Sequence, residues 1–98
     1  MLNVGAKKER EKGKVMAEKR VMSLVDLQAG QEGVVVGISG GHGLLRRLEA
    51  LGIRPGKKVA KISSMLLRGP VVVRVDGTQL AIGFGMASRV MVEVDATG

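Results

Sequence analysis

Alternating apolar positions along the chain predict a fold built mainly of short β-strands. Five segments carry Val, Ile or Leu at every second position or in short runs, and residues typical of turns separate them. They span residues 33–39, 57–63, 70–75, 78–83 and 90–94. Strands this short, with glycines at the corners, suit a sheet that closes or nearly closes on itself. The pattern therefore predicts a small, open, five-stranded barrel.

The sharpest local signal is Asp76-Gly77, which lies between two of these segments. Asp-Gly favours the two-residue turn of a β-hairpin. Residues that such a turn places opposite one another share a face of the sheet, and here that face is apolar and is expected to point to the core. The predicted pairs are Val75 with Thr78, Val73 with Leu80, and Val71 with Ile82.

Over residues 44–51 the apolar period changes to that of one short α-helix between strands. Leu44, Leu48 and Leu51 recur at helical spacing, with Leu45 at the edge of their stripe. Gly52 can adopt a positive φ, and Ile53 would then contact Leu48 in a Schellman-type cap. A helix of two turns is not stable alone in water, so its leucines are expected to plug the sheet.

The length of 98 residues allows one domain, and charge is concentrated at its start. Residues 1–20 carry seven Lys/Arg and three Glu, which gives +4 of the net +7. We interpret residues 1–22 as a basic, flexible N-terminal extension and residues 23–95 as the folded domain. A domain this small gains stability from assembly, so a homo-oligomer stays open.

Side chains for catalysis and metal binding are scarce. The chain has no cysteine and a single histidine, His42, which lies between two glycines. The glycine-rich stretch 40–43 precedes a helix but lacks the Lys and Ser/Thr of a phosphate-binding loop. We therefore predict no catalytic residue, no metal site and no cofactor, and a protein that binds a partner rather than an enzyme.

One candidate binding feature is the segment Met65, Leu66, Leu67 and Arg68, which we expect at the tip of a hairpin. Tips are usually polar, so an apolar one indicates a contact with another protein. The alternative is that the strand runs further and that Met65 and Leu67 belong to the core.

A second candidate is a basic set around the predicted helix and the strand after it. These side chains could contact a partner, although solvated surface charge is the simpler interpretation. The set comprises Arg46, Arg47, Arg54, Lys57, Lys58 and Lys61.

From Ser23 to Val94 the order of motifs resembles the ferrous iron transport protein A (FeoA) family. The chain reads L-x-x-L-x-x-G-x-x-G-x-V-V, a glycine-rich loop, and then L-R-R-L-E-A-L-G-I-R-P-G-K-K-V. It continues with G-P-V-V-V-R-V-D-G-T-Q-L-A-I and ends in V-M-V-E-V. Where many members have a charged, helix-like stretch after the fourth strand, this chain has Gly83-Phe84-Gly85-Met86.

The resemblance implies an SH3-like barrel and an accessory, regulatory role in ferrous iron uptake. The implied partner is the cytoplasmic part of FeoB, a membrane transporter that carries a GTPase domain. The implied location is cytoplasmic, with the inner face of the membrane as the place to which FeoB would bring the protein. The family supplies no defined metal ligands to carry over to this chain.

Two other functions compete with this one. Small SH3-like barrels also bind nucleic acid, and the net charge of +7 suits that, but one aromatic residue offers almost no surface for stacking bases. A domain of the same type lies at the C-terminus of iron-dependent repressors, although residues 1–22 are too few for their DNA-binding domain.

Overall fold

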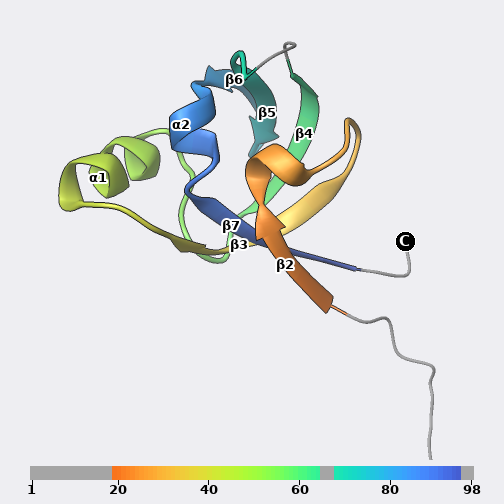
Figure 1. The fold of residues 1–98 in the computed structure, drawn as a ribbon, viewed down its shortest axis with the longest axis horizontal. Coiled ribbons are helices and arrows are strands. Elements are labelled where there is room, and N and C mark those ends of the chain that lie inside the picture. Colours follow the sequence, from red (N-terminus) through yellow and green to blue (C-terminus); the bar gives the residue numbers. More distant parts are fainter. Residues whose placement is uncertain (1–18, 65–67, 96–98) are drawn as a thin grey trace, which may run out of the picture.

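The computed structural model describes residues 19–64 and 68–95. Those residues form one antiparallel sheet of six strands in the order β2-β7-β3-β4-β5-β6. Three short helical segments interrupt the strands (Figure 1). The strands are β2 (Lys19–Ser23), β3 (Glu32–Ile38), β4 (Lys58–Ser64), β5 (Val71–Val75), β6 (Thr78–Ile82) and β7 (Val90–Asp95). The helical segments are η1 (Leu24–Asp26), α1 (His42–Ala50) and α2 (Phe84–Ala87).

The predicted mainly β, SH3-like architecture is confirmed, but the described residues form six strands rather than the predicted five. The additional strand is β2, which pairs with β7 from Lys19↔Asp95 to Ser23↔Met91. Residues 19–22, which were predicted to belong to the extension, are thus part of the sheet. The sequence hides this strand because its first three residues are exposed and two of them are charged.

The strands bend through two irregularities of register. In β3 the pairing with β7 shifts between Val35 and Gly37, and in β4 the pairing with β5 shifts between Lys61 and Ser63. An extra residue on one strand of an antiparallel pair increases the local twist and bends the strand. Such bends allow five-to-seven-residue strands to wrap around a common core.

The β5–β6 hairpin has the register predicted from Asp76-Gly77. All three predicted pairs are present, and the two turn residues have φ values of 52° and 79°. These positive values are those of a type I′ turn. Val71, Val73, Val75 and Ile82 are buried, whereas Leu80 is partly buried and Thr78 is exposed.

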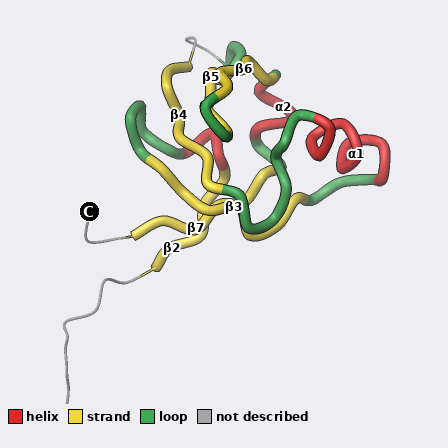
Figure 2. The backbone as a smooth tube through the Cα atoms, turned by 180° about the vertical axis from the view of Figure 1, so that it is seen from behind, coloured by secondary structure: helices red, strands yellow, loops and turns green. Residues whose placement is uncertain are grey.

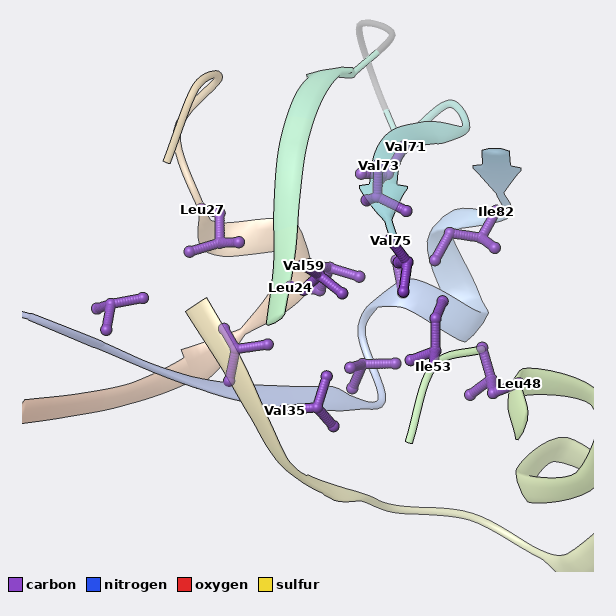
Figure 3. Close-up of a cluster of buried hydrophobic side chains, with 14 residues drawn as sticks. Leu24, Leu27, Val35, Leu48, Ile53, Val59, Val71, Val73, Val75 and Ile82 are labelled. Carbon is purple, nitrogen blue, oxygen red and sulfur yellow. The ribbon is translucent and has the colours of Figure 1, made fainter. Parts of the chain in front are cut away.

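The core is a cluster of aliphatic side chains inside the curved sheet (Figure 3). Valines from four strands supply most of it, as their preference for pleated, buried surfaces predicts. Leu24 and Leu27 enter from η1 and the residue after it, and Leu48 and Ile53 enter from α1 and the turn that follows.

Helix α1 begins two residues before the prediction and ends as the sequence indicates. Gly52 has φ +90°, its N–H donates to the Glu49 carbonyl at 2.9 Å, and the Ile53 N–H donates to the Leu48 carbonyl at 2.9 Å. These two bonds define the Schellman cap that was predicted. The prediction that Leu51 joins the plug is wrong, because Leu51 follows the helix and is 39% exposed.

Replacing Gly52 with alanine is expected to lower the free energy of unfolding by about 1 kcal/mol, because a Cβ strains the positive φ. Gly43→Ala is the matched control within α1. A Cβ there meets nothing within 4 Å, so it should raise stability by about 0.5–1 kcal/mol. Urea unfolding followed by circular dichroism measures both, and equal effects of the same sign would contradict the assignment.

Helices α1 and α2 lie at one end of the molecule, and the outer ends of β2 and β7 point away from them (Figure 1, Figure 2). Lys19 and Asp95, which occupy those strand ends, form an ion pair at 3.2 Å. We call the end that carries α1 and α2 the helical end of the domain, and the end formed by the outer ends of β2 and β7 its strand end.

Candidate partner-binding surface

The predicted apolar tip falls mostly outside the described residues. Met65, Leu66 and Leu67 lie outside them, so their role as a contact surface remains a prediction. Arg68 is described, and it is exposed with φ 66°. Its guanidinium carbon lies 5.7 Å from the centre of the Phe84 ring in α2, which is within the range of a cation–π interaction.

Five exposed arginines are carried by α1, by the turn after it, or by residues that border α2; we call them the helical-end arginines. Arg46 and Arg47 are on α1, and Arg89 follows α2. The Arg89 side chain lies beside Gly40 at the start of α1, where a Cβ built on that glycine would be 3.6 Å from Arg89 Cδ. The full set is Arg46, Arg47, Arg54, Arg68 and Arg89.

The arginines and lysines of the described residues differ in their partners. Three surface lysines form ion pairs: Lys19 with Asp95, Lys57 with Asp76 at 2.9 Å, and Lys58 with Glu32 at 3.9 Å. Within 19–64 and 68–95, no helical-end arginine pairs with a carboxylate. Guanidinium groups suit two-pronged binding of carboxylates and phosphates, so these exposed side chains have the chemistry to hold an anionic group.

The structure places the members of the predicted basic set in three different environments: exposed without a carboxylate partner among the described residues, paired with a carboxylate, or buried. Arg46, Arg47 and Arg54 are exposed, whereas Lys57 and Lys58 are held by carboxylates. Lys61 is only 6% exposed, and its ammonium group donates to the carbonyls of Val25 at 2.9 Å and Leu27 at 2.6 Å. Including Lys61 in a binding surface was wrong, because its side chain points inward.

The stretch Gly83-Phe84-Gly85-Met86, where the sequence departs from many FeoA members, forms the start of α2 after Gly83. Phe84 is partly exposed beside Arg68, and Met86 packs against the core. The sequence predicts a connection with one helical turn over Gly85–Ser88, and the observed helix begins one residue earlier, at Phe84. Nothing in the sequence indicated that this turn and α1 would lie at the same end of the barrel.

Other chemistry is scarce in the described part of the chain. No group of three or more His, Cys, Asp and Glu side chains there is arranged to hold a metal ion. His42 is exposed at the first position of α1. No described helix has both the length and the apolar character needed to cross a membrane.

Fold and surface together define a small SH3-like domain with an arginine-bearing helical end. Residues 22–94 match the FeoA domain model, and the chain therefore belongs to the FeoA family. A curated relative from Methanocaldococcus jannaschii, "Putative Fe(2+) transport protein A", is 39% identical over 64 residues, which are 65% of this chain and 76% of the relative.

Solved structures give the same assignment. The iron uptake regulatory protein FeoA is 40% identical, with a TM-score of 0.69 over 74% of this chain and 95% of that one. The zinc complex of Stenotrophomonas maltophilia FeoA, described as an SH3 domain protein, is 29% identical with a TM-score of 0.64, over 72% and 88% of the two chains. A manganese-dependent transcriptional repressor matches 82% of this chain but 43% of its own, at 22% identity and a TM-score of 0.69, which shows a shared fold.

Proposed function

We propose that this chain is a non-catalytic accessory protein of ferrous iron uptake that docks onto the cytoplasmic part of a FeoB-type GTPase transporter. Membership of the FeoA family over residues 22–94 carries this proposal. Relatives named for Fe(2+) transport and for regulation of iron uptake support it. The protein would act from the cytoplasm, at the inner face of the membrane while it is bound.

The helical-end arginines are the docking surface that the structure favours. Burying an arginine that already has a carboxylate partner breaks that pair, whereas an arginine without one gains a partner on docking. In the described part of the chain seven arginines have no carboxylate partner; five of them lie at the helical end and two, Arg20 and Arg74, stand singly on the sheet, whereas three surface lysines are already paired. The segment from Met65 to Leu67 would add apolar contact beside Arg68.

The double substitution Arg46→Ala and Arg47→Ala is expected to weaken binding to the cytoplasmic part of FeoB by about tenfold, since about 1.4 kcal/mol corresponds to a factor of ten. The control is Lys57→Ala with Lys58→Ala, which removes the same charge from paired lysines and should change affinity less than about twofold. Calorimetric titration of the purified partner with each variant measures both effects.

The salt dependence of binding distinguishes the contributions of the two parts of the docking surface. Added salt should weaken the contribution of the arginines, and the contact made by Met65, Leu66 and Leu67 should persist. Absence of binding by the wild-type chain at low and at moderate salt would sink the proposal. If the two double variants lost equal amounts of binding affinity, the docking surface would have to lie elsewhere than at the helical end. GTP hydrolysis by FeoB, measured with and without this chain, then shows the direction of regulation.

Binding of nucleic acid is the alternative that exposed arginines also permit. Phe84 is the only aromatic residue of the chain, and the Arg68 guanidinium lies over its ring. A gel shift titrated with salt distinguishes the two functions, because binding through phosphates falls steeply as salt rises.

A further inference from the structure

Strand β6 is one end of the sheet order, and four of its ten backbone N–H and C=O groups face away from the sheet. In the described residues it pairs with β5, with Val75 opposite Thr78 next to the turn. The turn closes through that pair, so hydrogen-bonded pairs then alternate along the hairpin. The N–H and C=O groups of Gln79 and Ala81 consequently point outward, and both of these residues are exposed.

The two edges of the sheet are protected differently. The other edge, β2, carries Lys19 and Arg20, and charged side chains of this kind discourage pairing between edges. Strand β6 reads Thr-Gln-Leu-Ala-Ile and has no charge, proline or glycine. It is therefore the edge of the described sheet to which a further strand can add.

We propose that β6 pairs antiparallel with β6 of a second copy of this chain, with Leu80 on the twofold axis. Gln79 of each copy then lies opposite Ala81 of the other. Each of these two pairs exchanges both of its backbone bonds, so all four outward groups of each copy find partners. The partly buried Leu80 packs beside its counterpart, which reduces apolar exposure on both copies.

The sequence of β6 favours a second copy over an unrelated extended segment. The strand is self-complementary in this register, since no charged side chain faces another and small Ala81 lies opposite Gln79. The nearest charge on the outer face is Arg74, opposite Gln79 on β5. The two copies of Arg74 would lie three strand spacings apart, about 14 Å, which exceeds the screening length of about 8 Å at physiological salt.

Sedimentation of the isolated full-length chain, from micromolar to millimolar concentration, tests the pairing without any transporter. We expect a reversible shift from monomer to dimer. Because both copies are positively charged, added salt should strengthen this association, opposite to its effect on docking. Failure of the docking proposal would thus leave this result unchanged. A chain that stays monomeric over the whole range would overturn the inference.

Substitutions in β6 test the proposed register between the two copies. Ala81→Pro removes an outward N–H without removing a bond to β5, so it should weaken the dimer by about tenfold while the chain stays folded. Ala81→Lys places two lysines diagonally across the axis, about 7–8 Å apart, and should weaken it as well. Adding Gln79→Glu to Ala81→Lys places each new carboxylate opposite a lysine of the other copy and should restore association.

This last variant also covers the case in which Ala81→Pro unfolds the chain. Circular dichroism of each variant confirms that β6 is intact. A dimer that is unaffected by Ala81→Lys, or that is not restored by the double substitution, would show that the copies meet through another surface and would overturn the proposed pairing.

Discussion

Replacing Leu48 with alanine is expected to lower the free energy of unfolding by about 3 kcal/mol, within the range of about 2–5 kcal/mol for buried Leu→Ala changes. Leu48 is the one fully buried residue of α1, and it packs in the core cluster that also includes Ile53 (Figure 3). Its loss leaves a cavity where the helix joins the barrel. A domain of this size has a total stability of about 5–15 kcal/mol, so the variant should still fold.

Leu51→Ala is the control for this prediction. It removes the same atoms from a side chain that is 39% exposed, so the expected loss is less than about 1 kcal/mol. The chain has no Trp or Tyr, so unfolding in urea is best followed by far-ultraviolet circular dichroism. Similar losses in both variants would show that α1 is not anchored through Leu48.

The same variant links packing to the proposed surface. Arg46 and Arg47 precede Leu48 directly on α1, so loosening the helix should also loosen their position. We therefore expect Leu48→Ala to weaken docking to the transporter at temperatures where the chain remains folded. Leu51→Ala should leave docking unchanged.

Local signals in the sequence were sufficient for much of the fold. The register of the β5–β6 hairpin follows from a turn pair and an alternation within twelve residues. The end of α1 follows from Gly52 and Ile53, because both bonds of the cap join residues at most five positions apart. Such features depend on backbone conformation and short-range contact, which composition and spacing report directly.

Features that depend on distant pairing could not be predicted from the sequence. Strand β2 exists because Lys19–Ser23 finds β7 more than sixty residues later. The different partners of Lys57, Lys58 and Arg54 depend on which carboxylate the sheet brings close, and no local pattern encodes that. The position of Arg89 beside the start of α1 likewise arises only after the barrel closes.

Lys61 shows this limit most clearly. Alternation along β4 places Lys61 on the same face as buried Val59, but no local pattern shows that its ammonium group would find the carbonyls of Val25 and Leu27 there. The backbone of Lys61 adds two more bonds to the same segment: its carbonyl accepts from the Gly30 N–H at 2.7 Å, and its N–H donates to the Gln31 carbonyl at 3.0 Å. One residue thus fixes η1 and the turn after it against the sheet.

Lys61→Met is therefore expected to lower the free energy of unfolding by about 2–3 kcal/mol. Methionine fills the space of the aliphatic stem but leaves the two carbonyls without a donor, and an unsatisfied buried carbonyl costs about 1–3 kcal/mol. Part of this loss is offset, since the variant no longer removes an ammonium group from water. Lys58→Met on the same strand is the control, and because that lysine is exposed its effect should stay within about 0.5 kcal/mol.

Hydrogen exchange identifies the origin of the Lys61 effect. If the ammonium group holds the segment from Val25 to Gln31, the Gly30 amide should exchange faster in Lys61→Met than in the wild type, whereas amides of the β5–β6 hairpin should change only with global stability. A Lys61→Met variant as stable as the wild type would mean that desolvation of the ammonium group costs as much as its two bonds contribute. Leu24 and Leu27 would then hold η1 in place by packing alone.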